Sequence, residues 1–117
     1  MGGIGFSVSR AQLGSDTLVV GVSGEIDLAT AAPFEQELTD AIHDRDPQKV
    51  VVDLSDVTFM DSMALNALVR AFELQRTRLA TMCLVSNDPR VLTLLEITRL
   101  NELLPTYPTR EEALAAR

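Results

Sequence analysis

Alternating hydrophobic and polar positions near the start of the chain predict a β-hairpin. Residues 6–8 and residues 18–22 each alternate between apolar and polar or small side chains, the period-two pattern of a strand with one buried face. Residues 14–16 (GSD), which lie between these runs, are typical turn residues. We therefore expect two antiparallel strands joined by this turn.

The next hydrophobic positions follow helical spacing. Phe34, Leu38 and Ile42 form one stripe, in a segment that begins near Thr30 and ends near residues 44–46. Acidic and polar residues occupy the positions between them, as on the solvent face of a helix. This pattern predicts a first amphipathic helix.

Three further segments have the pattern of helices. The second expected helix has Asp61 or Ser62 as its N-cap and continues to about Arg76. The third begins at Pro89, because proline is favoured in the first turn. A last helix is expected over residues 109–116, with acidic residues in its first turn.

Short apolar runs between these helices predict the remaining strands. Residues 50–54 (VVVDL) form a nearly continuous apolar run, typical of a strand in the middle of a sheet. Residues 82–85 (MCLV) and, more briefly, residues 103–104 are expected to add two more strands. Strands that alternate with helices indicate an α/β fold. We expect one domain, residues 1–117, with a mixed, mostly parallel sheet, an N-terminal hairpin and about four helices.

Composition restricts the possible partners and location. The formal net charge is −7, so nucleic acid is not expected as a partner, because its phosphates would be repelled. No apolar run reaches the roughly 18–20 residues that span a bilayer, and no membrane partner is expected. Residues 1–6 lack the basic and apolar segments of a secretory signal, which favours a cytoplasmic location.

The residues needed for common active sites are scarce. His43 is the only histidine and Cys83 the only cysteine, so a zinc site or a Ser-His-Asp triad is not expected. A paired-carboxylate mechanism would have to use Asp27 and Asp61, and we give it little weight. Asp53 is expected only to bond backbone groups. No nucleotide-binding glycine motif occurs, and we predict neither enzymatic activity nor a cofactor.

Three motifs in a fixed order carry a resemblance to a known family. Residues 24–31 (GEIDLATA) follow the predicted hairpin, and residues 51–62 (VVDLSDVTFMDS) join the central strand to the second helix. A weaker third motif is residues 95–100 (LEITRL). Together they resemble the STAS domains of anti-sigma-factor antagonists over nearly the whole chain. The resemblance implies a STAS-like fold.

The resemblance also implies a function and a site. Ser62 matches the serine that is phosphorylated in the family, whereas Met63 and Ala64 replace a usual second hydroxyl residue and glycine. The unphosphorylated protein is then expected to bind an anti-sigma factor of the serine-kinase type, which uses its own ATP and Mg²⁺ to phosphorylate Ser62 and is thereby released. A separate phosphatase would restore the serine. The expected partner-binding residues are Asp27, Leu28, Thr30, Met60, Asp61, Met63 and Asn66.

The physical basis of such a switch is charge. A phosphate adds roughly −1.5 to −2 charges, and a helix N-terminus tolerates it without a change of fold. Beside Asp27 and Asp61 it would increase the negative charge that a docked partner must accept. The alternative is a STAS scaffold or ligand-binding module of a multiprotein complex, without phosphorylation, which the residues Met63 and Ala64 favour.

Overall fold

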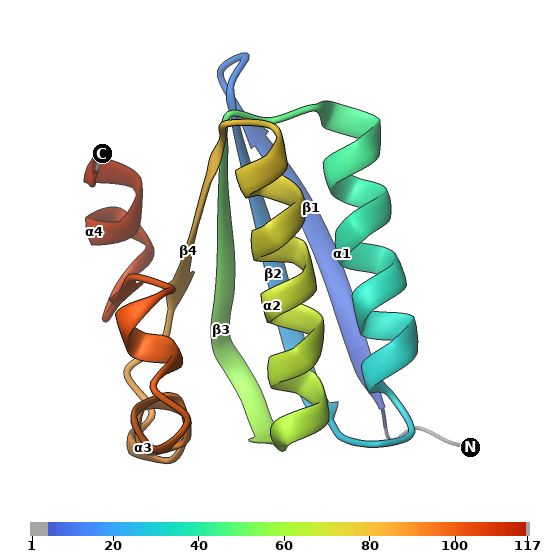
Figure 1. Cartoon of the computed structure of the whole chain (residues 1–117), viewed down its shortest axis with the longest axis vertical. Coiled ribbons are helices and arrows are strands. Elements are labelled where there is room, and N and C mark those ends of the chain that lie inside the picture. The colour runs from blue at the N-terminus through green and yellow to red at the C-terminus, as the bar shows by residue number, and fades with distance from the viewer. Residues whose placement is uncertain (1–4, 117) are drawn as a thin grey trace.

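The computed structural model, which describes residues 5–116, contains one five-stranded sheet with helices on both of its faces (Figure 1). The strands lie side by side in sequence order; β1 and β2 are antiparallel and the other neighbours are parallel. This arrangement confirms the predicted fold class. In chain order the elements are β1 (Phe6–Leu13), β2 (Thr17–Ile26), α1 (Ala31–Arg45), β3 (Lys49–Met60), α2 (Ser62–Thr77), β4 (Thr81–Val85), α3 (Pro89–Ile97), the 3₁₀ turn η1 (Leu100–Glu102), β5 (Thr106–Tyr107) and α4 (Arg110–Ala115).

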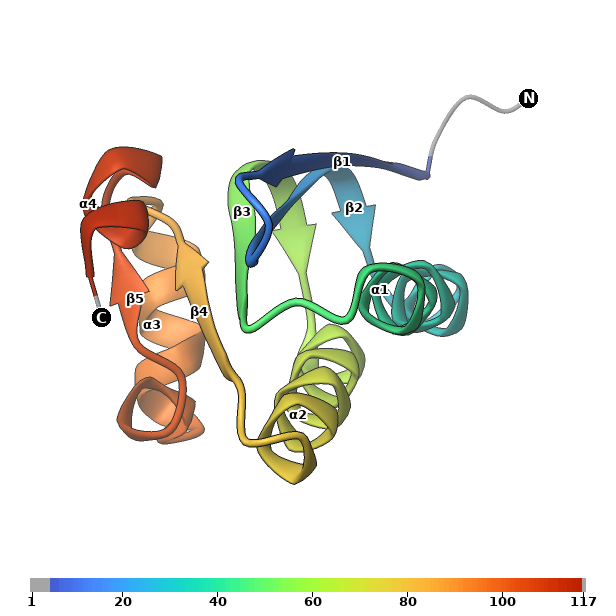
Figure 2. The same ribbon diagram turned by 90° about the horizontal axis from the view of Figure 1, so that it is seen from above.

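The two faces of the sheet are covered unequally (Figure 2). The main core lies between one face and helices α1, α2 and α3, and its fully buried side chains include Phe34, Leu38 and Leu68. On the other face, α4 covers a smaller cluster that contains Val51 and Cys83. Within residues 5–116, none of the helices combines the length and apolarity needed to cross a bilayer.

The N-terminal hairpin depends on a glycine at its open end. Gly24 has a φ of 98°, a conformation that side chains with a Cβ rarely adopt. A Cβ at this position would lie 2.2 Å from the carbonyl oxygen of Gly5, the residue that precedes β1. The close approach of the two strands therefore requires glycine, and it holds β1 against the end of β2 that leads to the site.

Two strands differ from their predicted positions. β3 extends to Met60, well beyond residues 50–54, because two β-bulges let it continue beside β2. The last strand is Thr106–Tyr107 and not residues 103–104. Leu104 is instead completely buried in the main core, and the following Pro105 carbonyl accepts the first hydrogen bond from β4, from the N–H of Leu84 at 2.9 Å.

Candidate functional site

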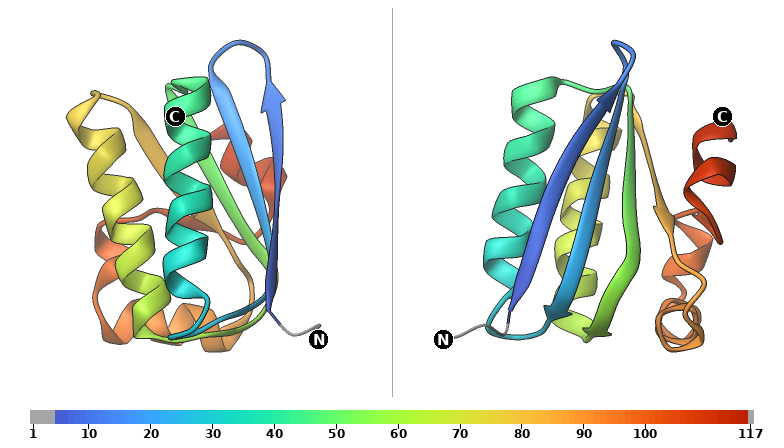
Figure 3. Two further views of the ribbon diagram at one scale, coloured as in Figure 1. Left: turned by 90° about the vertical axis from the view of Figure 1, so that its right-hand side faces the viewer. Right: turned by 180° about the vertical axis from the view of Figure 1, so that it is seen from behind.

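The ends of β2 and β3 bring two segments of the chain together. Ile26 pairs with Met60, and the N–H of Asp61 donates to the carbonyl oxygen of Ile26 at 3.3 Å. The turn that follows β2 and the start of α2 therefore lie at the same end of the sheet, below the ends of these strands in Figure 3. We call residues 27–30 and 58–66 the Ser62 surface.

Asp61, and not Ser62, caps α2. Its Oδ1 accepts hydrogen bonds from the N–H groups of Met63 at 2.9 Å and Ala64 at 3.3 Å. Asp61 has an extended backbone, whereas Ser62 is the first helical residue and is exposed. The helix start therefore does not require the hydroxyl of Ser62 as a cap, and this side chain is accessible from solvent.

The turn after β2 is organised by Asp27 and Thr30. Oδ1 of Asp27 accepts from the N–H groups of Ala29 at 3.0 Å and Thr30 at 3.2 Å. The hydroxyl of Thr30 in return accepts from the N–H of Asp27 at 2.8 Å and donates to the carbonyl of Glu25 at 2.9 Å. Both side chains thus maintain the shape of the turn, as Asp61 does for α2, and they hold Leu28 at its tip.

Three large apolar side chains of the Ser62 surface are exposed. Leu28 is 74% exposed and Phe59 50%, and Met63 is also exposed. Asn66, one turn along α2 from Ser62, is exposed as well. The turn after β2, the end of β3 and the first turn of α2 thus each present a large apolar side chain to solvent. Contiguous exposed apolar surface is typical of a site that binds another molecule.

Met60, which the resemblance implies to be a partner-binding residue, does not belong to this exposed group. Its side chain is only 9% exposed and lies in the main core. The reason is the second bulge of β3, at Thr58, which reverses the alternation of the strand so that Phe59 points outward and Met60 inward. The exposure of Phe59 is not apparent from the sequence, since no local signal marks the bulge.

A small hollow of about 150 Å³ adjoins the Ser62 surface. Phe59 and Met60 from the end of β3 line it together with Asp88 and Arg90 from the start of α3. Asp88 caps α3 by accepting from the N–H of Arg90 at 2.9 Å, and it also accepts from the guanidinium at 2.8 Å. These hydrogen bonds from Arg90 hold the pKa of Asp88 below its ordinary value.

Comparison with known proteins identifies the family. The family model described as "STAS domain" matches residues 10–113, which is most of the chain. The chain belongs to the STAS domain family.

Relatives of this STAS domain share most of its length. An anti-sigma F factor antagonist of Paenibacillus polymyxa is 29% identical over 97 residues, which cover 83% of each chain. An anti-sigma-B factor antagonist of Listeria monocytogenes is 31% identical over 98 residues, covering 84% of this chain and 85% of the relative. The crystal structure of an anti-sigma factor antagonist from Mycobacterium paratuberculosis superposes with a TM-score of 0.85 at 31% identity, and covers 93% of this chain and 91% of that one.

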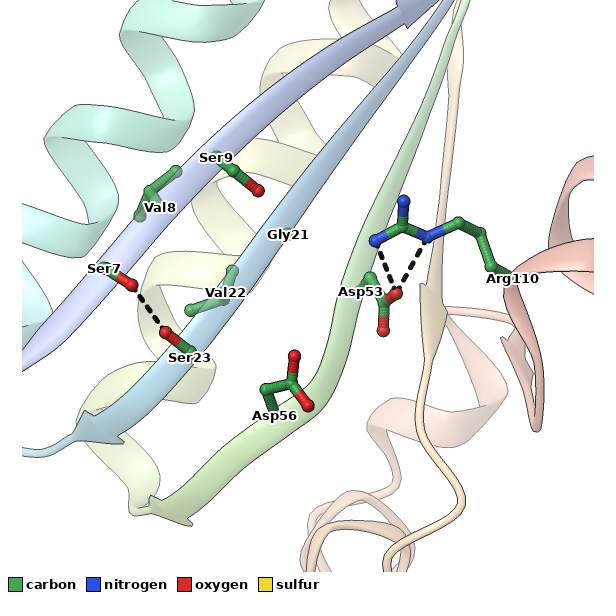
Figure 4. Close-up of a pocket in the computed structure, with 9 residues that line it drawn as sticks. All are labelled: Ser7, Val8, Ser9, Gly21, Val22, Ser23, Asp53, Asp56 and Arg110. Atoms are coloured by element: carbon green, nitrogen blue, oxygen red, sulfur yellow. Dashed lines mark hydrogen bonds and ion pairs between the residues drawn. The ribbon is translucent and has the colours of Figure 1, made fainter.

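The STAS domain has a second, more polar hollow on the other face of the sheet, beside α4 (Figure 4). It measures about 160 Å³. Its lining residues come from β1, β2, β3 and α4, and they are Ser7, Val8, Ser9, Gly21, Val22, Ser23, Asp53, Asp56 and Arg110.

Asp53 has a larger role in this hollow than the sequence suggested. It was expected to bond backbone groups only, but its Oδ2 accepts from Nε of Arg110 at 2.9 Å and lies 2.8 Å from Nη2. Its Oδ1 accepts from the N–H and the hydroxyl of Ser55. Partial burial raises the pKa of Asp53, but the hydrogen bonds from Ser55 and Arg110 outweigh it and leave the pKa below its ordinary value.

The remaining residues that the sequence singled out lie apart from the Ser62 surface. His43 is exposed near the end of α1. Cys83 is buried in the smaller core, as expected, and burial raises the pKa of its thiol. Within the described part of the chain, no three residues of the metal-binding types His, Cys, Asp and Glu lie close enough together to hold a metal ion.

Proposed function

We propose that this STAS domain is an anti-sigma-factor antagonist whose Ser62 is a phosphorylation switch. The unphosphorylated protein binds an anti-sigma factor of the serine-kinase type through the Ser62 surface and so leaves the sigma factor free. The bound kinase, with its own ATP and Mg²⁺, phosphorylates Ser62, and the complex dissociates. A phosphatase returns the protein to its binding form.

The observation that carries the proposal is the position of Ser62. Its side chain is exposed on the first residue of α2, while Asp61 provides the cap that a serine at a helix start would otherwise supply. A kinase can therefore reach the hydroxyl without unwinding the helix. The names of the relatives, which are anti-sigma factor antagonists with similarity over most of the chain, support the same partner class.

Exposed apolar side chains around Ser62 provide binding energy for a protein partner. Leu28 and Phe59 are large and solvent-accessible in the free protein, so covering them removes apolar surface from water. Met63 is exposed beside them, and its flexible thioether adapts well to a partner surface. Met60, which is only 9% exposed, lines the hollow beside Phe59 and offers little surface to a partner.

Electrostatics explain how phosphorylation releases the partner. The chain carries a net charge of −7, and Asp61 is the immediate neighbour of Ser62. A phosphate adds roughly −1.5 to −2 charges in the middle of the contact. Each ~1.4 kcal/mol of repulsion or desolvation weakens the complex tenfold, so a few kcal/mol suffice for release.

The residues after Ser62 are compatible with this role although they depart from the family pattern. Ala64 is completely buried in the first turn of α2, where its N–H donates to Asp61. Alanine is the most favourable residue for a helix interior, so its presence stabilises the start of α2. Met63 changes the surface next to the hydroxyl, and we expect it to select the partner and not to block phosphorylation.

Phosphorylation in vitro tests the proposal. The protein is incubated with ATP, Mg²⁺ and purified candidate anti-sigma kinases, and its intact mass is measured. We expect one added phosphoryl group in the wild type and in the control variant Ser15→Ala. Ser15 is exposed in the hairpin turn at the opposite end of the sheet. Ser62→Ala should remain unmodified.

Binding provides the second test. Wild-type protein should capture the kinase in the absence of ATP, whereas Ser62→Asp and Ser62→Glu should bind it several-fold more weakly. If wild type binds partners but is never phosphorylated, and the acidic variants bind equally well, the phosphorylation switch is wrong. That result would favour a STAS scaffold or ligand-binding module.

A further inference from the structure

A β-bulge in β3 lies between the polar hollow and the Ser62 surface. Gly21 of β2 pairs with Asp53, but Ser23 pairs with Asp56, so β3 has one extra residue in this interval. A bulge leaves the main chain of the extra residue outside the ladder, bends the strand and changes where the following side chains point. Here the N–H of Ser55 donates to Oδ1 of Asp53 at 2.9 Å. The carboxylate of Asp53 therefore accepts a hydrogen bond from a main-chain group of the bulge.

Arg110 holds that carboxylate from another element. Its Nε and Nη2 both reach Oδ2 of Asp53, as the dashed lines in Figure 4 show. Asp53 is only 9% exposed, so its charge is largely removed from water and depends on this partner. A Cβ at Gly21 would lie 3.6 Å from Nη2 of Arg110, an ordinary van der Waals distance, and 2.7 Å from the hydroxyl oxygen of Ser9, which would have to move.

The helix that carries Arg110 is itself fixed to β3. Ala113 of α4 is completely buried against the sheet. Nζ of Lys49, the first residue of β3, donates to the carbonyl oxygen of Ala113 at 2.7 Å and also to that of Ala116. Helix α4 is therefore attached at its C-terminal end by Lys49 and at its N-terminal end by the ion pair of Arg110 with Asp53.

The bulge determines the position of Ser62 through the register of β3 with β2. Asp53 pairs with the β2 residue 32 positions before it in the sequence, and Met60 pairs with the β2 residue 34 positions before it. The register therefore shifts by one residue at each of two steps. The second step, at Thr58, is supported by a hydrogen bond of 3.2 Å from the Thr58 hydroxyl to the carbonyl of Gly24. These two steps place Met60 beside Ile26, and so bring Ser62 next to the turn that carries Leu28.

We propose that Arg110 is a positioning residue for the Ser62 surface. It acts through Asp53 and the bulge between Asp53 and Asp56, which sets the register and direction of the end of β3. Helix α4, on the opposite face of the sheet from α2, thereby controls the geometry of the phosphorylation site. The effect on phosphorylation rests on the function proposed above, whereas the effect on β3 does not.

The structural test replaces Arg110 by glutamine, which removes the charge and retains most of the side-chain length. Arg99→Gln is the matched control, because Arg99, the residue before η1, forms an ion pair with Glu102 and not with β3. Amide hydrogen exchange and amide chemical shifts are measured by NMR. We expect faster exchange at Ser55 and shifted amides over residues 59–62 in Arg110→Gln only. Changes confined to α4 and residues 53–55 would overturn the proposal.

The functional test measures phosphorylation of the same variants by the kinase that modifies the wild type. Arg110→Gln should lower kcat several-fold with a smaller change in KM, since Ser62 and Phe59 are displaced while Leu28, in the turn after β2, keeps its contact. Arg110→Lys should recover part of the rate, because lysine keeps the charge but not the two-pronged contact. Unchanged kcat in Arg110→Gln would contradict the proposal. If no kinase modifies wild type, the proposed function fails, and the NMR measurements still decide the role of Arg110.

Discussion

The main-chain N–H of Asp61 donates to the carbonyl oxygen of Ile26 across 3.3 Å, one residue beyond the last paired residues of β2 and β3. This bond joins the residue that caps α2 to the residue that precedes the Asp27 turn. The serine and the exposed Leu28 are therefore held by one continuous hydrogen-bonded unit, and not by two independent loops. Changes in this unit, in its caps and in its supporting glycine are open to direct measurement.

Loss of the α2 cap should reduce stability more than loss of the serine. Asp61→Ala removes the acceptor for two N–H groups and is expected to lower the free energy of unfolding by about 0.5–2 kcal/mol. Ser62→Ala should change it by less than about 0.5 kcal/mol, since Asp61 still caps the helix. Urea denaturation of both variants checks this. Equal losses would mean that Ser62 contributes to the cap in solution.

Leu28 should matter for partner binding and not for folding. It is 74% exposed, so Leu28→Ala is expected to leave the free energy of unfolding within about 0.5 kcal/mol of the wild type. Binding of the anti-sigma factor, measured by calorimetry, should weaken by at least about 1 kcal/mol. Leu79→Ala is the matched control, because Leu79 is 91% exposed beyond the far end of α2. Equal binding losses in both variants would argue against the Ser62 surface as the contact.

Gly24 should tolerate alanine poorly. Its φ of 98° and the 2.2 Å approach of a Cβ to the Gly5 carbonyl predict both backbone strain and a steric clash. We expect Gly24→Ala to cost about 1–3 kcal/mol from the strain alone, with more from the clash. Gly14 also has a positive φ, of 66°, but a Cβ there meets open space. Gly14→Ala should therefore cost clearly less in the same denaturation experiment, and a reversed order would contradict this account of the hairpin.

Acid should weaken the attachment of α4. The folded state holds the pKa of Asp53 below its ordinary value, because the bonds from Ser55 and Arg110 favour the carboxylate more than burial opposes it. The resulting stabilisation is complete above the unfolded value, about 3.9, and is lost as the pH falls through the lower folded pKa. Asp53→Asn should reduce the slope of stability against pH below about 4. An unchanged slope in this variant would exclude Asp53 as a source of the acid sensitivity.

Local patterns were sufficient to predict most of the fold. The apolar run at residues 50–54 is a clear sequence signal because all five residues are buried in β3. The apolar stripes of α1 and α2 are equally clear signals, because each helix buries one continuous face. The capping pattern at Asp61 and Ser62 also located the start of α2, although it did not decide between the two residues. The order of the three motifs is by itself sufficient to indicate the family.

The errors have a common physical origin in long-range contacts. The pair of Arg110 with Asp53 joins residues 57 positions apart, and nothing near Asp53 in the sequence indicates it. The bulge at Thr58 reverses which side chains of β3 are buried, so the burial of Met60 and the exposure of Phe59 cannot be inferred from the local alternation of residues. Leu104 was assigned to a strand because a short apolar pair has the same local pattern whether it fills a core or joins a sheet.

The placement of Ser62 on the first helical residue, with Asp61 holding the free N–H groups behind it, has a consequence for turnover. A group attached to that hydroxyl adds charge outside the hydrogen-bonded framework, so neither its addition nor its removal requires the helix to unwind and re-form. Under the proposed phosphorylation of Ser62, each cycle would then leave the cap of α2 intact. The same molecule would pass through many such cycles without approaching the unfolded state.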